Sequence, residues 1–275
     1  MLNIKFTKTA LFCLLISLTV KGQRKDQGIR FINEITADSV FFHLENNYYA
    51  PITIQTTPNL EMEGRIRVNK AALVSKRDTL FKTIAVPLNL VIDTTAIDYS
   101  QFIEFKGNLG DANLTEDTKH LYALPFEKGK AYEIMQANFG RVSHDKKTSF
   151  YAIDFTMPEG TPVHAARAGI VIKTQDKYTE RGGEELKYKA NTIAIFHEDG
   201  TIGHYDHLQT QGVFVKPGDY VKTGQYIGLS GYTGYTTKPH LHFVVQNGKN
   251  EAVPIYFKGY KNKVLKQGKH YKNKK

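Results

Sequence analysis

The chain is poor in cysteine, the residue that forms disulfide bonds and thiolate metal sites. Its 275 residues include a single cysteine, Cys13, which lies in an amino-terminal apolar run. Once that run is removed, the protein has no disulfide bond and no thiolate ligand, so a metal must be held by histidine and carboxylate groups. Apolar residues make up 41% of the chain, with 16 Tyr and 16 Phe, which fills the cores of one large or two modest domains.

Residues 1–22 are predicted to be a signal peptide. Lys5 and Lys8 precede an apolar run from Ala10 to Val20, and Val20-Lys21-Gly22 forms the exit of a secretory signal. A membrane anchor is the alternative, but it needs about 20 apolar residues where this run has about 11. We therefore expect export to the periplasm or the medium, with cleavage near Gly22 or Gln23.

The net charge of +10 is concentrated at the two ends of the chain. Residues 258–275 hold eight lysines and no acid, and the predicted signal holds three more lysines. Without these lysines the net charge is −1, so the body has no basic face and no specific nucleic-acid partner is expected. Residues 258–275 are predicted to be a flexible basic tail, either simply solvated or in electrostatic contact with an anionic envelope surface.

The expected fold is all-β, in two domains. Over residues 23–115, short runs of β-branched and aromatic residues alternate with turn residues, which predicts a small β-sandwich-like module. His43 and His120 are isolated histidines, and the polar segment from Gly107 to Lys119 is the expected linker. Residues 116–257 contain further β runs, more glycine and no amphipathic helix, which predicts an antiparallel β-sheet domain.

The most informative motif is His240-Leu241-His242, which closes a glycine-rich stretch from Gly228 to Gly234. Alternate side chains of a strand share a face, so both imidazoles can point into one site. Three further segments of the second domain belong with this pair: Ser143-His144 followed by Tyr151-Ala152-Ile153-Asp154-Phe155, Gly160 to Ala166, and Tyr205-Asp206-His207-Leu208.

Together these segments, from His144 to Val245, resemble the lysostaphin and LytM family of zinc metalloendopeptidases, which cut the peptide part of peptidoglycan. The resemblance implies that His144, Asp154 and His242 hold Zn²⁺, and that His207 and His240 stand unligated beside the metal. Three protein ligands leave a zinc position open for water, and free histidines can move its proton and stabilise the oxyanion. Which of His207 and His240 acts as the base is left open.

The chain departs from the family pattern in two places. In the family, the ligand histidine usually stands four positions before the ligand aspartate, whereas His144 and Asp154 are ten positions apart. We interpret the difference as an inserted loop. If His144 is displaced from the site, Asp145 is the local substitute, because a carboxylate also binds zinc. Tyr232 and Lys238 replace residues common in the family and are expected at the rim of the cleft. The long polar segment between Lys173 and Asn191 is either a wall of that cleft or a tolerated insertion.

The remaining histidines of this domain, His164, His197 and His204, are expected to be structural. The sequence therefore predicts an exported zinc endopeptidase acting on peptidoglycan cross-links or stems. The alternative is a catalytically inactive relative that binds and activates a cell-wall amidase. The scissile bond is open between D-alanyl and glycine-containing peptides, with the D-alanyl type favoured. The N-terminal module is expected to recognise the cell wall or a partner, or to occlude the cleft.

Overall fold

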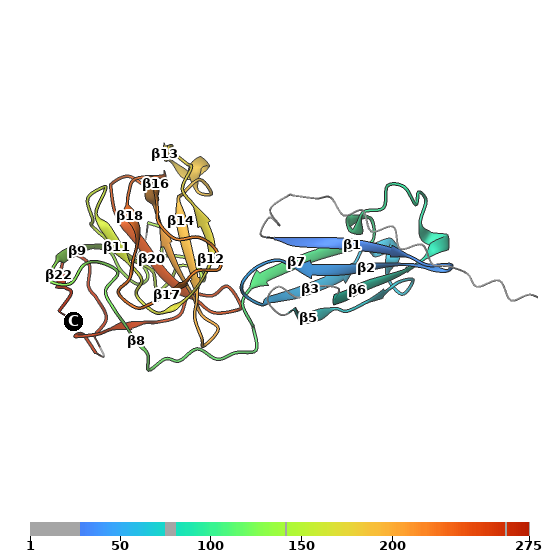
Figure 1. Cartoon of the computed structure of the whole chain (residues 1–275), viewed down its shortest axis with the longest axis horizontal. Coiled ribbons are helices and arrows are strands. Elements are labelled where there is room, and N and C mark those ends of the chain that lie inside the picture. The colour runs from blue at the N-terminus through green and yellow to red at the C-terminus, as the bar shows by residue number, and fades with distance from the viewer. Residues whose placement is uncertain (1–27, 75–80, 141, 262, 275) are drawn as a thin grey trace, which may run out of the picture.

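The computed structural model describes residues 28–274 apart from 75–80, 141 and 262. The predicted signal peptide and Cys13 lie outside this range, so export stays a prediction. In the described part of the chain, no helix is long and apolar enough to span a membrane. The described residues form β-strands and short 3-10 helices, which confirms the all-β prediction (Figure 1). They divide into an N-terminal module, residues 29–109, and a C-terminal module, residues 121–274.

The N-terminal module consists of two antiparallel sheets, with strand orders β1-β2-β6-β4 and β5-β3-β7. Alternation along β2 turns Val40, Phe42 and Leu44 inward, and each is fully buried. Both sheets contribute to the same apolar cluster, because Ile103 of β7 packs with Val40 and Phe42. The elements are β1 (Ile29–Ile35), β2 (Ser39–Asn46), β3 (Ile52–Pro58), η1 (Leu60–Met62), β4 (Arg67–Val68), β5 (Ala71–Val74), β6 (Phe81–Pro87), η2 (Leu88–Leu90), η3 (Tyr99–Gln101) and β7 (Ile103–Leu109).

The C-terminal module is built on an eight-stranded sheet of order β17-β12-β14-β15-β20-β10-β9-β22, with a three-stranded sheet β11-β18-β16 beside it. Its elements are β8 (Leu121–Tyr122), β9 (Ala131–Gln136), β10 (Ile153–Phe155), β11 (Pro162–His164), β12 (Gly169–Gln175), β13 (Arg181–Gly182), η4 (Glu184–Leu186), β14 (Thr192–Phe196), β15 (Ile202–Asp206), β16 (Leu208–Val213), β17 (Tyr220–Val221), β18 (Tyr226–Ser230), β19 (Gly234–Tyr235), β20 (Leu241–Gln246), β21 (Tyr256–Phe257) and β22 (His270–Lys272).

The two faces of the large sheet have different roles. One face forms the main core against the small sheet, where Tyr205 and Phe243 of the large sheet cluster with Val163 and Ile227 of the small one. Side chains alternate along a strand, so the residues between the core positions point to the opposite face. We call this opposite face the outer face; it carries Asp154, Asp206 and His242, which are cross-strand neighbours.

The C-terminal end is not a flexible tail. Strand β22 pairs with β9, with Tyr271 opposite Tyr132. Leu265 is only 3% exposed and belongs to the main core. The predicted flexible tail from residue 258 onward is therefore wrong for the described residues. The lysine-rich composition concealed the apolar positions, because lysine stems can lie along apolar surface while their ammonium groups stay in water.

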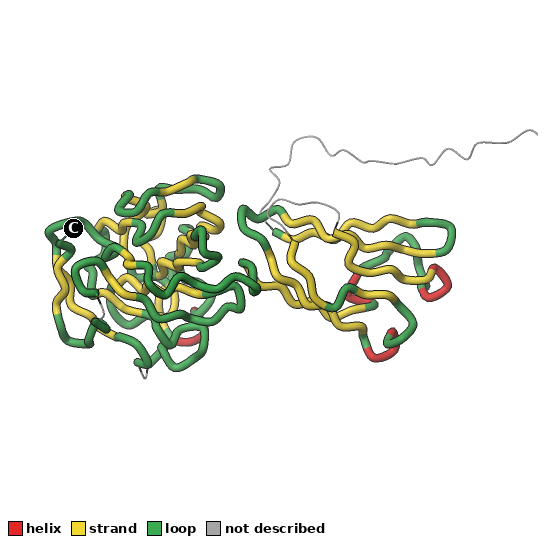
Figure 2. The backbone as a smooth tube through the Cα atoms, turned by 90° about the horizontal axis from the view of Figure 1, so that it is seen from below, coloured by secondary structure: helices red, strands yellow, loops and turns green. Residues whose placement is uncertain are grey.

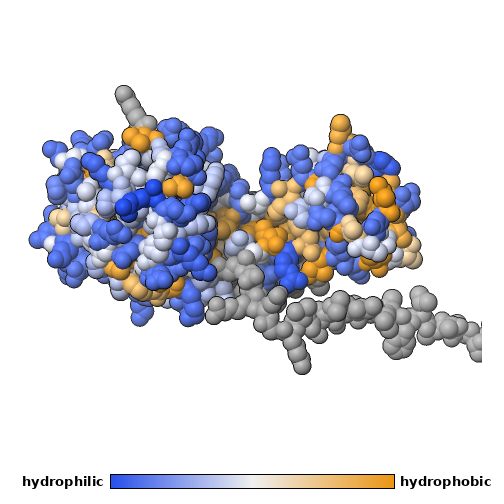
Figure 3. All heavy atoms as spheres, turned by 90° about the horizontal axis from the view of Figure 1, so that it is seen from above, coloured by the Kyte–Doolittle hydropathy of each residue, from blue (hydrophilic) through white to orange (hydrophobic). Residues whose placement is uncertain are grey.

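The two modules meet on the outer face of the large sheet. Tyr49, Ala50 and Leu109 of the N-terminal module pack there on a patch formed by Ile172, Ala194, Phe196 and Ile202. The tube view shows the two modules next to each other along the long axis (Figure 2). On the face seen in Figure 3, apolar residues gather on the N-terminal module and at the junction, whereas most of the C-terminal module is hydrophilic.

The polar segment between the modules is attached to both of them. Gly110 N donates to Pro51 O at 2.7 Å in the N-terminal module. Asp117 N donates to Asp199 Oδ2 at 3.0 Å in the C-terminal module. The expected linker from Gly107 thus begins inside β7, and its later residues are tied down by hydrogen bonds.

Candidate metal centre

The candidate site is built on the row of outer-face residues that crosses β10, β20 and β15. Asp154 pairs with His242, and His242 pairs with Asp206. His240 precedes β20 and is separated from His242 by the buried Leu241, so both imidazoles point to the outer face. His240 Nε2 and His242 Nδ1 lie 3.8 Å and 2.8 Å from the same carboxylate oxygen, Asp154 Oδ1.

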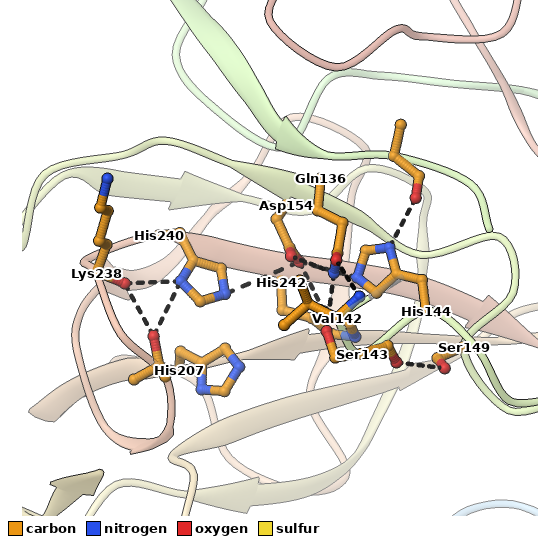
Figure 4. A network of polar contacts seen from close by, with 12 residues as sticks. Gln136, Val142, Ser143, His144, Ser149, Asp154, His207, Lys238, His240 and His242 are labelled. Carbon is orange, nitrogen blue, oxygen red and sulfur yellow. Dashed lines mark hydrogen bonds and ion pairs between the residues drawn. The ribbon is translucent and has the colours of Figure 1, made fainter. Parts of the chain in front are cut away.

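Three side chains converge closely enough to hold one metal ion. His144 Nε2 lies 3.3 Å from Asp154 Oδ1, and one donor atom from each of His144, Asp154 and His242 lies within 4.8 Å of the others. Figure 4 shows these three side chains pointing toward one another. Ligands about 2.0 Å from a tetrahedral zinc ion are about 3.3 Å apart, which agrees with the 3.3 Å separation of His144 Nε2 and Asp154 Oδ1.

The burial of the donor atoms also fits a metal. His144 is fully buried, and its Nε2 has no hydrogen-bond partner among the described residues. A buried polar atom without a partner costs free energy unless another group satisfies it. A His/Asp/His set is a typical zinc donor set, so a metal at this position would supply the missing interaction.

His144 reaches the site although ten residues separate it from Asp154. Its backbone N donates to Gly140 O at 3.0 Å, and its Nδ1 donates to Ala137 O at 2.9 Å. The second bond leaves Nε2 of the neutral ring as an acceptor facing Asp154. Asp145, the expected substitute, is exposed and does not join the cluster.

His207 and His240 present the same ring nitrogen to the site. His207 Nδ1 donates to Thr233 O at 2.7 Å, and His240 Nδ1 donates to Lys238 O at 2.8 Å. Because a carbonyl oxygen only accepts, each neutral ring keeps its proton on Nδ1 and offers Nε2 as a proton acceptor. The two ring centroids are 4.6 Å apart.

The backbone at the end of β15 has an unusual conformation that places His207 beside the site. Strand β15 ends at Asp206, and His207 adopts φ +63°, a conformation that non-glycine residues rarely take. A Cβ on Gly231 would lie 2.3 Å from the backbone N of Gln209, so only glycine permits the close approach of the two segments beside His207.

The site groups fall into different charge states. Burial alone would raise the pKa of Asp154, but its contacts with His144 and His242 and the nearby imidazole charges hold it well below its ordinary value. Burial, then the charges of His240 and His242, lowers the pKa of His207 to about 4. Burial also lowers the pKa of His240. His242 is the exception, because Asp154 overcomes the effect of burial and raises the pKa of His242.

The segment between Lys173 and Asn191 stands next to the loop that leads to His240. Its strand β13 pairs in parallel with β19, joining Arg181 to Gly234. The Arg181 guanidinium lies over the Tyr232 ring, 4.5 Å from the centroid. Tyr232 Oη donates to Thr237 O, in the loop that contains Lys238, at 2.8 Å. These contacts attach the segment to the loop that carries Lys238, and whether it is a wall of a cleft or a tolerated insertion stays a prediction.

The other histidines lie outside the ligand cluster. His197 is fully buried and its Nδ1 donates to Ala168 O at 2.9 Å, which fits its expected structural role. His43 makes a 2.9 Å ion pair with Glu34 in the N-terminal module. His120 stacks edge-on against Tyr122, and His164 lies beside Tyr226. His204 lies on β15 opposite Val244.

One residue of the site was missed by sequence reasoning. Gln136, at the end of β9, pairs opposite Asp154 and its Nε2 donates to Asp154 Oδ2 at 3.2 Å. A glutamine before a glycine-containing loop has no chemical signature of its own. Only the pairing of β9 with β10 reveals its role.

Comparisons with known proteins cover the part of the chain that carries most of this site. Residues 148–254 match Peptidase family M23, a range that includes Asp154, His207, His240 and His242 but not His144 or Gln136. Lysostaphin from Staphylococcus simulans is 44% identical over 94 residues, which is 34% of this chain and 17% of lysostaphin. The peptidoglycan DD-endopeptidase ShyA from Vibrio cholerae serotype O1 is 40% identical over 90 residues, which is 33% of this chain and 18% of ShyA.

Two further similarities complete this comparison. An uncharacterized metalloprotease from Buchnera aphidicola is 37% identical over 100 residues, which is 36% of this chain and 24% of that protein. The solved catalytic domain of lysostaphin from Staphylococcus simulans aligns at 32% identity over 47% of this chain and 88% of that domain, with a TM-score of 0.34. The chain thus spans less than a quarter of the length of these three curated relatives.

Proposed function

We propose that this protein is an exported zinc metalloendopeptidase that hydrolyses peptide bonds in bacterial peptidoglycan, because its residues 148–254 match peptidase family M23. The observation that carries the proposal is the convergence of His144, Asp154 and His242, with a buried and unpartnered His144 Nε2. Export is supported by the basic start and the apolar run at the beginning of the sequence.

The donor set favours zinc. Two imidazoles and one carboxylate would hold the ion at three positions, and no cysteine lies among the described residues. Bound Zn²⁺ supplies a Lewis acid that polarises the scissile carbonyl and makes water nucleophilic near neutral pH. The low pKa of Asp154 keeps its carboxylate charged, as a ligand must be.

His207 and His240 are proposed to carry the proton transfers. Each is neutral at pH 7 because burial lowers its pKa, and each offers Nε2 as the acceptor. One ring takes the proton of the attacking water on Nε2 and then delivers that same proton to the leaving amine. The other ring can stabilise the developing oxyanion of the substrate once it has taken up a proton from solvent on Nε2. Backbone carbonyls of Thr233 and Lys238 fix the tautomer that this task needs.

Peptidoglycan is proposed as the substrate because of the relatives' stated activities. ShyA is a peptidoglycan DD-endopeptidase and is 40% identical to this chain over 90 residues. The range that matches the family, residues 148–254, holds four of the five proposed site residues. We favour a D-alanyl cross-link over a glycine-containing peptide as the bond that is cut.

The test is mass spectrometry of the peptides released from purified peptidoglycan by the mature protein, with and without a zinc chelator. New peptide termini that disappear with the chelator are the expected result, and their masses identify the bond. Zinc-loaded protein that releases no new termini would overturn the proposal and favour a protein that binds the wall or activates an amidase.

A further inference from the structure

Gln136 occupies a position between the two segments that supply His144 and Asp154. It ends strand β9, is 7% exposed, and lies opposite Asp154 of β10. Its Nε2 donates to Ser143 Oγ at 2.8 Å and to Asp154 Oδ2 at 3.2 Å. Its Oε1 accepts the backbone N–H of Val142 at 3.1 Å. Figure 4 shows this amide in contact with both segments.

These three bonds constrain both ligands at once. Asp154 Oδ1 faces the two imidazoles, at 3.3 Å and 2.8 Å, so the bond to Oδ2 fixes the rotation of the carboxylate that presents Oδ1. Val142 and Ser143 immediately precede His144, so the same amide holds the backbone that delivers this ring. Partners of this kind commonly orient metal ligands and tune metal affinity.

We propose that Gln136 is a positioning residue that orients Asp154 and His144 for metal binding across the ten-residue insertion between them. The inference rests on the proposed function, because it concerns the same zinc site. Gln136 lies outside residues 148–254, the range that matches the family, so the proposal concerns a contribution of this chain's own flanking segment.

Gly140 supports the assignment independently. A Cβ at Gly140 would lie 2.3 Å from Gln136 Cγ and 2.6 Å from Gln136 Cδ. The φ of Gly140 is not in the left-handed region, so an alanine could adopt this backbone. The obstacle to a larger residue is therefore the side chain of Gln136 itself. An alanine at this position would displace the amide from its hydrogen bonds.

The first experiment measures the zinc affinity of the full chain by competition with a chromophoric chelator at fixed pH. Gln136→Met keeps the length of the side chain but removes all three hydrogen bonds, and we expect zinc to bind about 10- to 100-fold more weakly. The control is Ile134→Ala on the same strand, where a fully buried core side chain is truncated. It should lower thermal stability without weakening zinc binding. Equal zinc affinity in Gln136→Met and the unaltered protein would overturn the inference.

A double-mutant cycle checks the same inference without depending on one variant. Gly140→Ala should weaken zinc binding about as much as Gln136→Ala. In the Gln136→Ala background the obstructing side chain is gone, so adding Gly140→Ala should cost little more. If the fold-loss of zinc affinity in the double variant equals the product of the losses in the two single variants, the proposal is contradicted. If the unaltered protein itself binds no zinc, the proposed function fails; if it binds zinc and only the Gln136 effects are missing, the positioning role alone fails.

Discussion

At the scale of single residues, the site separates the groups that we propose to bind a metal from the groups that we propose to move protons. Asp154 is held charged, and its interaction with His242 favours a proton on that ring when no metal is present. His207 stays neutral, because burial and the charges of His240 and His242 lower its pKa to about 4. The contact with Asp154 thus distinguishes His242 from His207, although both side chains are imidazoles.

This division predicts different results for two alanine variants. His242→Ala should lose zinc and activity together, because the ligand set then has only two protein donors. His207→Ala should retain zinc and lose turnover by roughly 10²- to 10⁴-fold. Metal analysis and peptidoglycan assays measure both effects. His270→Ala, an exposed histidine outside the site, is the control and should change neither. Loss of zinc in His207→Ala would show that the roles are assigned wrongly.

The raised pKa of His242 predicts how zinc affinity depends on pH. Zinc competes with a proton for the imidazole, and Asp154 stabilises that proton in the metal-free protein, above the ordinary pKa of 6.5. Apparent affinity should therefore rise with pH, by about tenfold per unit for one displaced proton, and level off above the raised pKa of His242. Titrations with the metal between pH 5 and pH 9 measure this slope. An affinity that is flat from pH 5 to pH 7 would contradict it.

At the scale of elements, segments outside the family match complete the sheet and the site. Strand β9 supplies Gln136 next to Asp154, and β22 covers the other edge of β9. Leu265, which leads into β22, is buried in the main core. The end of the chain thus stabilises the strand that contacts the ligands.

Two neighbouring residues test this role of the C-terminal segment. Leu265→Ala removes a side chain that is 3% exposed, and we expect the free energy of unfolding to fall by about 2–5 kcal/mol. Val264→Ala alters a side chain that is 50% exposed and should change it by less than about 0.5 kcal/mol. Urea unfolding of the metal-free protein compares the two. If both variants lower the free energy of unfolding by the same small amount, the C-terminal segment is not packed on the core in solution.

At the scale of the whole molecule, one sheet face carries both the metal centre and the contact between the modules. Ile202, in the contact, and Asp206, in the site row, lie on the same strand and face the same way. Four residues of a strand span about 13 Å, so the N-terminal module lies near the metal centre without contributing a ligand to it.

The contact between the modules predicts the effect of a buried charge. Ala50 is fully buried within it, so Ala50→Asp would place an unpaired carboxylate against apolar side chains. We expect the modules to separate, which small-angle scattering detects as an increased radius of gyration, while each module stays folded. Ala96→Asp introduces the same charge at an exposed position and should leave the scattering unchanged. An unchanged radius in Ala50→Asp would mean that the contact is not maintained in solution.

The sequence by itself determined the β class of the protein and the motifs that contain Asp154, His207, His240 and His242. These features are local: alternation, glycine turns and residue spacing follow from the geometry of a few consecutive residues. Only the tertiary structure decided how His144 reaches the ligand set across the ten-residue separation, that Gln136 bonds to Asp154 and to the segment before His144, and that the lysine-rich end contains a strand. Each of these depends on which distant segments pair, for example β9 with both β10 and β22. No local pattern specifies such pairing, because burial and hydrogen bonding across the whole sheet select it.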